Sequence, residues 1–412
     1  MGGPGAELFG QEEIDEVLDV LRGGRLGRYG AEDDPRFKGK VHRLEEEIAR
    51  RSGVAHAVAV NSGTTALWVA LVGLGIGAGD EVIVPGFTFV ASISAIVYTG
   101  ATPVLAEIDE SFDLDPADVA AKITPRTRAI MAVHMLGNPA RLAELVEIAK
   151  RHGVALIEDC AQAFGASYCG RPVGSFGVAA ALSFNSFKTI SCGDGGMLLT
   201  NDEELHRRFF ALHDQGHSPL RSGIEIGQRP FLGLNFRMTE LSAAVLIAQL
   251  GKLDKILARL RQNKRLFKSL IADLPGLGFR ALPDPEGDIA THLTVIFPTA
   301  AIARRVAAEL HSRVLAESGW HIYSQMEHLL NKRTATMKGP PFAGPDGDRG
   351  PKYRQGMLPR TDDLVGRAMS IGIGVADPNL GSTFGVTVLD GPDEVRARAR
   401  QFCDAAVRHL DA

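Results

Sequence analysis

A lysine and an aspartate in this chain have the residue types and surroundings of a cofactor site. Lys188 lies in the segment Ser183-Phe-Asn-Ser-Phe-Lys188-Thr-Ile-Ser-Cys-Gly-Asp-Gly-Gly196, 29 residues after Asp159. A lysine amine can form an imine with an aldehyde cofactor, and an upstream aspartate can hold a protonated pyridine nitrogen. This pairing is typical of enzymes that use pyridoxal phosphate, so the sequence predicts an enzyme.

Asp159 directly follows the apolar run 154–158, which reads as a strand. A carboxylate at such a strand end projects from the sheet edge into a cleft, although most aspartates in this position form turns or cap helices. A buried carboxylate opposite the ring nitrogen would keep that nitrogen protonated and make the ring an electron sink. Gln162 could donate a hydrogen bond to the phenolic oxygen of the cofactor, or be an ordinary amide on a helix surface.

A candidate phosphate site lies at Asn61-Ser-Gly63-Thr64-Thr-Ala-Leu67, after a predicted strand and at the start of a predicted helix. Free backbone N–H groups at a helix N-terminus bind anions, because the helix dipole and the unpaired donors both favour negative charge. The alternative is that a hydroxyl here only caps the helix.

Short β-rich runs alternate with helical stretches in the first two thirds of the chain, which predicts βαβ units and an α/β fold with a mostly parallel sheet. A helical pattern from 237 to about 274 follows and is expected to bridge two domains, a large one at 1–250 and a small α/β one at 251–412. The Pro- and Gly-rich segment 338–351 excludes regular structure and is either a functional flap or disordered. The predicted strands are 55–60, 81–85, 102–106, 129–134, 154–158, 181–184 and 197–200, and the predicted helices are about 64–75, 89–98, 139–152 and 203–213.

Composition argues against several other classes of protein. The chain has 412 residues, is 45% hydrophobic and carries a net charge of −4, so neither nucleic acid nor an anionic membrane is expected as a partner. No run approaches a membrane span and the N-terminus does not resemble a secretion signal, which predicts a cytoplasmic protein. The four cysteines form no Cys-x-x-Cys pair, and the spacing of His213 and His217 does not favour a metal site because Gly216 interrupts the helix between them.

Five motifs occur in order along the chain and carry a family resemblance. They are the segment 61–67, Pro85-Gly-Phe-Thr-Phe89-Val-Ala, Glu158-Asp159-Cys-Ala-Gln162-Ala-Phe-Gly165, the lysine segment, and Gly233-Leu-Asn235-Phe-Arg237-Met-Thr-Glu240. Together they resemble the DegT/DnrJ/StrS aminotransferases, which act on sugars and cyclitols. The resemblance implies fold type I of the pyridoxal-phosphate-dependent transferases, similar to aspartate aminotransferase, and a ping-pong transfer from glutamate or glutamine.

The resemblance also implies roles for individual residues. Lys188 would carry pyridoxal 5′-phosphate as an imine and later move protons, while Asp159 would pair with the pyridine nitrogen and Phe89 would stack on the ring. Phosphate would be bound by the backbone at Gly63 and Thr64 with the hydroxyl of Ser183. Asn235 would reach the phosphate from a neighbouring subunit, which implies a homodimer with shared active sites.

Two positions depart from the family pattern. One retained residue, the lysine, distinguishes the transaminases of the family from its dehydratases. Position 194 is Asp where Glu is common, and position 185 is Asn where an aromatic residue or His is frequent. Both changes affect packing around the lysine more than the chemistry. Dehydratase relatives carry His in place of the lysine, so Lys188 favours transamination.

The sugar-binding residues are less clearly marked. By position or type the candidates are Arg28, Tyr29, His217, Trp320 and His321, although Trp320 and His321 could equally be core residues. Several segments resemble the aminotransferases that make 8-amino-3,8-dideoxy-octulosonate, and an acid substrate of that kind would need a cation. A nucleotide-sugar or cyclitol aminotransferase is the alternative, and the candidate cations for an acid are Arg28, Arg221, Arg229 and Arg360.

Two non-enzymatic alternatives fit the sequence less well. A transcriptional regulator built on this fold would place a DNA-binding domain ahead of the phosphate motif, which here begins at residue 61. A non-catalytic homologue would have lost the lysine. Neither expectation is met by this sequence.

Overall fold

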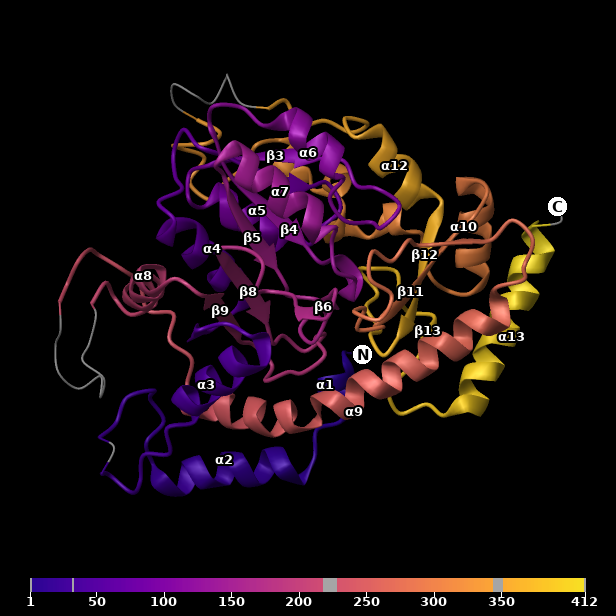
Figure 1. Cartoon of the computed structure of the whole chain (residues 1–412). Helices are drawn as coiled ribbons and strands as arrows, with labels where there is room; N and C mark the ends of the chain where they lie inside the picture. The colour runs from indigo at the N-terminus through magenta and orange to yellow at the C-terminus, as the bar shows by residue number, and fades with distance from the viewer. Residues whose placement is uncertain (1, 32, 218–227, 344–350, 411–412) are drawn as a thin grey trace.

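The computed structural model describes residues 2–31, 33–217, 228–343 and 351–410. A seven-stranded sheet, in the order β1-β9-β8-β5-β4-β2-β3, occupies the N-terminal half of the chain (Figure 1). Only β9 runs antiparallel to its neighbours within this sheet, so the predicted mostly parallel sheet is confirmed. The strands are β1 (His56–Val60), β2 (Glu81–Pro85), β3 (Thr102–Ala106), β4 (Thr127–Val133), β5 (Ala155–Asp159), β8 (Ala179–Ser183) and β9 (Gly196–Thr200), each close to its predicted bounds.

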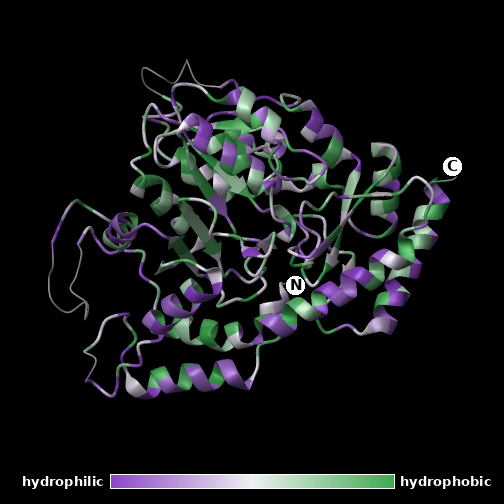
Figure 2. Cartoon of the chain, in the orientation of Figure 1, coloured by the Kyte–Doolittle hydropathy of each residue, from purple (hydrophilic) through white to green (hydrophobic). Residues whose placement is uncertain are grey.

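Helices cover both faces of this sheet, which explains why most residues of its strands are apolar (Figure 2). Alternate residues of a strand point to opposite faces. Leu156 therefore packs with α3, α7 and α9 on one face, while Ile157 packs with α4, α5 and α8 on the other. These helices are α3 (Lys40–Ser52), α4 (Gly63–Gly73), α5 (Val90–Val97), α7 (Leu142–His152), α8 (Glu203–His213) and α9 (Glu240–Ile271).

The long helix α9 connects this sheet to a four-stranded sheet (Figure 1). Thr239 caps its start by accepting a hydrogen bond from the N–H of Ser242, and its N-terminal part packs against α2 and α3. Its C-terminal part packs against α13, and the proposed domain boundary between residues 250 and 251 falls inside this helix. The second sheet contains β10 (Gly278–Phe279), β11 (His292–Ile296), β12 (Ala368–Ile373) and β13 (Gly385–Val386), with α10 (Ala300–Glu309) and α13 (Pro392–Leu410) beside it.

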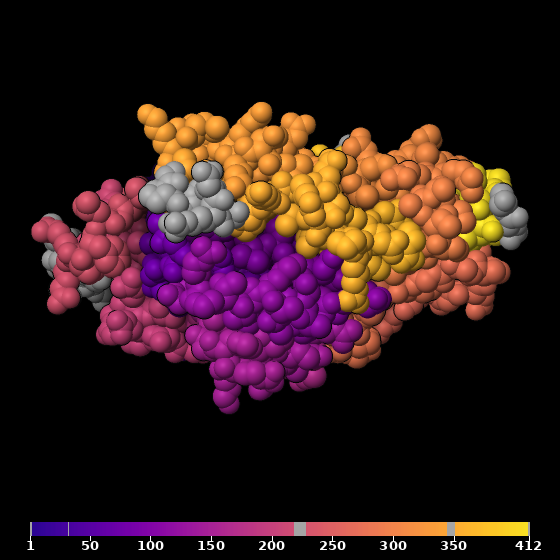
Figure 3. Space-filling model, turned by 90° about the horizontal axis from the view of Figure 1, so that it is seen from above, coloured from indigo at the N-terminus to yellow at the C-terminus, as the bar shows by residue number. Residues whose placement is uncertain are grey.

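The chain between β11 and β12 returns to the large sheet, as the orange segments lying against purple ones in Figure 3 show. Ile322 forms a bridge with Phe87, and the hydroxyl of Tyr353 donates to the carbonyl of Pro103 at 2.7 Å. The described residues of the segment 338–351 contain turns but no helix or strand, as predicted, and 344–350 lie outside the described residues. This region contains α11 (Glu327–Leu330), α12 (Pro359–Gly366) and the short 3-10 turns η2 (Leu315–Glu317), η3 (Gly319–His321) and η4 (Tyr323–Gln325).

Several further elements were not predicted, most of them because they have too few residues to show a period. They are α1 (Pro4–Glu7), α2 (Gln11–Gly23), α3, α6 (Pro116–Lys122), β6 (Ser167–Tyr168), β7 (Arg171–Pro172) and the turn η1 (Met135–Gly137). Within the described ranges, no helix combines the length and the apolar character that crossing a bilayer requires.

Two glycines should respond oppositely to alanine. Gly251 lies inside α9, and a Cβ added there would have nothing within 4 Å, so Gly251→Ala should raise the free energy of unfolding by roughly 0.5–1 kcal/mol. Gly374 has φ +125° and a Cβ there would lie 2.4 Å from Leu260 Cδ2, so Gly374→Ala should lower it by roughly 1–3 kcal/mol. Thermal or denaturant unfolding checks both, and equal effects would contradict this account of the packing.

Candidate functional site

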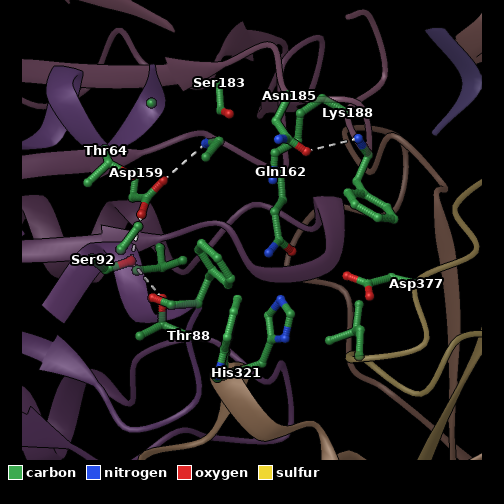
Figure 4. A pocket seen from close by; sticks show the side chains of 18 of the residues that line it. Thr64, Thr88, Ser92, Asp159, Gln162, Ser183, Asn185, Lys188, His321 and Asp377 are labelled. Atoms are coloured by element: carbon green, nitrogen blue, oxygen red, sulfur yellow. Dashed lines mark hydrogen bonds between the residues drawn. The ribbon is translucent and has the colours of Figure 1, made fainter. Parts of the chain in front are cut away.

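A cavity of about 320 Å³ opens where the carboxyl ends of the parallel strands meet (Figure 4). The turns after β1, β2 and β5 and the loop between β8 and β9 line it from the large sheet, and the C-terminal part of the chain closes the opposite side. Nine sequence-predicted residues line this one space: Gly63, Thr64, Phe89, Asp159, Gln162, Ser183, Lys188, Trp320 and His321.

Asp159 ends β5 and is buried on the α5 side of the sheet, the side to which Ile157 also points. Its Oδ2 accepts a hydrogen bond from the hydroxyl of Ser92 at 2.7 Å, and its Oδ1 accepts from the N–H of Ala161 at 3.1 Å. Burial raises the pKa of Asp159, while these donors and the nearby Lys188 oppose the rise. A cationic ring nitrogen brought to this carboxylate would find a poorly solvated negative charge.

Ser92 and Thr88 support this aspartate and were missed by the sequence analysis. The two hydroxyls lie 2.8 Å apart and continue the hydrogen-bond chain away from Asp159. Thr88 precedes α5 and Ser92 lies in its first turn, so no helical period links the two residues in the sequence.

Lys188 lies in the loop between β8 and β9, which is held in place by backbone contacts at both ends. The N–H of Phe184 donates to Gly195 at 2.9 Å, and the N–H of Lys188 donates to Asn185 at 2.9 Å. Burial lowers the pKa of the Lys188 amine, and the carboxylates of Asp159 and Asp377 oppose that effect. A lowered pKa increases the neutral fraction of the amine, which is the form that attacks a carbonyl carbon and accepts a proton.

The N-terminal segment of the chain braces this loop. Gly3 donates its N–H to the carbonyl of Ser186 at 2.8 Å, and the carbonyl of Gly2 accepts from the N–H of Ala376 at 3.2 Å. The carbonyl of Gly5 accepts from the side chain of Gln249 in α9 at 3.0 Å. One short segment thus connects the lysine loop, the turn before Asp377 and the long helix.

The predicted phosphate site has the donors that an anion requires. Ser62 caps α4 through the N–H of Thr65 at 3.1 Å, which confirms a capping role for this segment. The N–H groups of Gly63 and Thr64 and the hydroxyl of Ser183 meet no acceptor among the described residues, and all three residues line the cavity. A Cβ at position 63 would lie 2.6 Å from Ser183 Cβ, so glycine is needed for this close approach. These donors fit a phosphate monoester.

Gln162 presents an amide donor to the cavity. Its side-chain oxygen accepts from the N–H of Leu136 at 2.9 Å, a contact that leaves the NH₂ group free to donate elsewhere. This orientation is compatible with the predicted bond to a phenolic oxygen. With Asp159, Lys188 and the unpaired donors at α4, the residues present fit pyridoxal phosphate.

The two departures from the family pattern lie together. The side-chain amide of Asn185 donates to Asp194 Oδ1 at 3.2 Å across the lysine loop. Each residue is therefore the partner of the other, and the pair fixes the loop that presents Lys188.

The C-terminal part of the chain contributes a wall that the sequence analysis identified only in part. His321 is 4% exposed and its ring lies 5.1 Å from that of Phe89, whereas Trp320 is 59% exposed at the cavity rim. Thr291, His292, Asp377 and Asn379 also line the cavity and were not predicted. They come from the start of β11 and the residue before it and from the turn after β12, and no local motif marks them.

Four predicted residues lie outside the cavity of this chain. Arg28 is buried, with its guanidinium bonded to Glu45 at 3.1 Å and 2.8 Å from His213 Nε2. The other three surround Asp214: the hydroxyl of Tyr29 donates to its carboxylate, His217 contacts its carbonyl oxygen, and Asn235 forms a backbone bridge with it.

The buried imidazoles of the C-terminal wall should make the protein sensitive to acid. Burial lowers the pKa of His292 to about 3 and that of His321 to about 4, below the value of about 6.5 in an unfolded chain. The unfolded state therefore binds more protons between these values, and the free energy of unfolding should fall as the pH falls from about 6.5 toward 4, by roughly 1–3 kcal/mol per imidazole. His292→Gln should reduce this slope in denaturant unfolding across that range, with the exposed His328→Gln as control. An unchanged slope in His292→Gln would contradict the assignment.

Comparisons with known proteins place the chain among aminotransferases. The model of the DegT/DnrJ/EryC1/StrS aminotransferase family matches residues 8–334. GDP-perosamine synthase of Caulobacter vibrioides is 47% identical over 216 residues, which are 52% of this chain and 57% of that protein, so this match spans less than two thirds of the relative. The dTDP-3-amino-3,4,6-trideoxy-alpha-D-glucose transaminase of Streptomyces venezuelae is 38% identical over 360 residues, or 87% of each chain.

A solved structure shares the fold. The crystal structure of 3-amino-5-hydroxybenzoic acid synthase superposes with a TM-score of 0.77 and 29% identity, covering 97% of both chains. This similarity confirms the predicted fold type I of the pyridoxal-phosphate-dependent transferases. The chain belongs to the DegT/DnrJ/EryC1/StrS aminotransferase family.

Proposed function

We propose that this protein is a pyridoxal-phosphate-dependent aminotransferase that moves an amino group from glutamate or glutamine to the oxo group of a keto- or aldehydo-sugar or a cyclitol. The observation that carries the proposal is the meeting of Asp159, Lys188 and the unpaired donors of α4 in one cavity. These groups match the ring nitrogen, the aldehyde carbon and the phosphate of a single cofactor.

Different residues of this chain would bind different parts of the cofactor and move the proton. Gly63, Thr64 and Ser183 would hold the phosphate, and Asp159 would hold the ring nitrogen in its protonated form. When bound, pyridoxal phosphate would supply an aldehyde for the amine and a ring able to delocalise the electron pair left by loss of the Cα proton of the amino donor. Lys188, once free, would take that proton and return it on the other side of the transfer.

We also propose that two copies of the chain complete each other's sites. Asn235 does not line the cavity of its own chain, and the neighbouring Leu232 and Leu234 are 97% and 54% exposed. This placement supports the expectation that Asn235 serves the phosphate of a second subunit in a homodimer.

The described arginines among the candidate partners for a sugar acid such as the octulosonate do not line the cavity of this chain. Arg28 is paired with Glu45, and Arg360 contacts Glu110 and Asp115, and neither arginine lines the cavity. Arg229 is exposed and does not line the cavity, and Arg221 lies outside the described residues. No arginine among the described residues of this chain therefore lines the cavity, and the α-carboxylate of the amino donor would be bound by other groups.

Removing the lysine amine tests the proposal directly. Purified protein with pyridoxal phosphate should show the visible absorbance of the lysine-bound cofactor, and an amino donor should bleach it. Lys188→Ala should lack this band and lose transamination by at least about a thousandfold, because it removes the group that moves the proton. Spectra and assays with a panel of keto-sugars, cyclitols and sugar acids measure both, with the exposed Lys255→Ala as control. Turnover by Lys188→Ala would refute the mechanism.

The phosphate site can be tested separately. Gly63→Ala places a methyl group 2.6 Å from Ser183 Cβ and 3.0 Å from its Oγ, so the dissociation constant of pyridoxal phosphate should rise by about tenfold or more. Gly77→Ala, whose Cβ would meet only Thr99 O at 3.6 Å, is the matched control. Fluorescence titration of the cofactor measures both constants, and equal affinities would argue against phosphate binding at α4.

A further inference from the structure

The cavity wall opposite the sheet presents two hydrogen-bond acceptors toward the space that Lys188 also faces (Figure 4). They are the carboxylate of Asp377, in the turn after β12, and the imidazole of His321, in η3. Neither has a role in holding the cofactor, whose ring nitrogen, phosphate and carbonyl carbon are accounted for by residues of the large sheet. The pair is therefore available to the substrates.

Asp377 is fixed in place with half of its carboxylate unused. It is 9% exposed, and its Oδ1 accepts from the N–H of Asn379 at 2.8 Å. Its backbone N–H donates to the hydroxyl of Ser382 at 3.1 Å, and the N–H of Ser382 donates to its carbonyl at 3.0 Å. Among the residues that the structure describes, no lysine or arginine forms an ion pair with it. Oδ2 thus offers a rigid, unpaired acceptor at the cavity surface.

His321 offers a second acceptor beside it. Its Nδ1 lies 3.3 Å from the carbonyl oxygen of Ser318, which can only accept, so Nδ1 carries the proton. Burial lowers the pKa of the ring to about 4, which keeps it neutral near pH 7. In the neutral ring the remaining nitrogen, Nε2, has a lone pair and no hydrogen.

The charged residues that line the cavity also favour an uncharged substrate group that donates hydrogen bonds. Of the described residues that line it, Lys188 alone is a lysine or arginine, whereas Asp159, Asp194 and Asp377 are acidic. A second carboxylate brought against Asp377 would meet like charge in a poorly solvated space, which is unfavourable. An amide or a hydroxyl would instead donate hydrogen bonds to both acceptors.

We propose that Asp377 and His321 select L-glutamine over L-glutamate as the amino donor, by accepting the two N–H bonds of its side-chain amide. The inference rests on the proposed function, because it concerns the first substrate of the same ping-pong reaction. Glutamate has the same length but ends in an acceptor with a negative charge, so it meets repulsion where glutamine meets two bonds. In the second half of the reaction, hydroxyl groups of a neutral sugar or cyclitol make the same kind of contact.

The test compares the two amino acids in the first half of the reaction alone. Cofactor-loaded enzyme is mixed with L-glutamine or L-glutamate over a range of concentrations, and the loss of visible absorbance gives the specificity constant for each. The wild-type enzyme should prefer glutamine by about tenfold or more, the value of one charge-assisted hydrogen bond.

Asp377→Asn is the informative variant because Asn keeps the side-chain oxygen that accepts from Asn379, removes the charge and replaces the acceptor Oδ2 by an NH₂ donor. It should lower the preference for glutamine by about tenfold or more, because glutamine loses an acceptor and its KM rises, while glutamate gains a donor and its KM falls. Asp393→Asn removes a charge from an exposed pair on α13 and should leave the preference as in wild type.

The outcomes separate the two proposals. A wild-type enzyme that uses both donors equally, or an Asp377→Asn variant with the wild-type ratio, would overturn the inference and leave the aminotransferase proposal intact. Bound cofactor that neither amino acid bleaches would refute the proposed function and the inference with it. If the variant does not fold, the ratio of the specificity constants for glutamine and glutamate in the wild-type enzyme still tests the inference.

Discussion

The site is organised around one electrostatic constraint, the burial of Asp159 at the end of a central strand. A carboxylate removed from water must be compensated, and here Ser92 and the N–H of Ala161 supply two hydrogen bonds but no full charge. Lys188 is the nearby cation whose field reaches it. The cavity therefore contains a buried carboxylate, Asp159, and a buried amine, Lys188. It favours a ligand that brings a cationic ring to the carboxylate and an electrophilic carbon to the amine.

The large sheet explains how residues so distant in sequence reach this position. Parallel strands bring the turns after β1, β2 and β5 to one edge, and the single antiparallel strand β9 forces the lysine loop to turn back across the same edge. The alternation of side chains then assigns directions: Asp159 points to the cavity side, while its neighbour Glu158 points to the other face, where it accepts three backbone N–H groups between positions 174 and 177.

Much of this half of the molecule could be predicted from sequence, because local signals determine it. Apolar runs of strand length, the cap at Ser62 and the glycines beside Lys188 each act within a few residues, and the residues of the cofactor site sit on them. The C-terminal wall has no such signal. Asp377 and His292 become neighbours of Lys188 only through the packing of two sheets, which no short window of sequence records. Arg28 and Tyr29 do not line the cavity of this chain, and their partners Glu45 and Asp214 are likewise distant along the chain.

The brace formed by residues 2–5 gives the N-terminal end of the chain an unexpected importance. Its contacts with Ser186, Ala376 and Gln249 join the proton-moving lysine, the wall that faces it and the helix that spans both sheets. The distance between nucleophile and substrate is thus partly set by a segment that most truncation schemes would treat as dispensable. A purification tag is better attached after α13, none of whose residues lines the cavity.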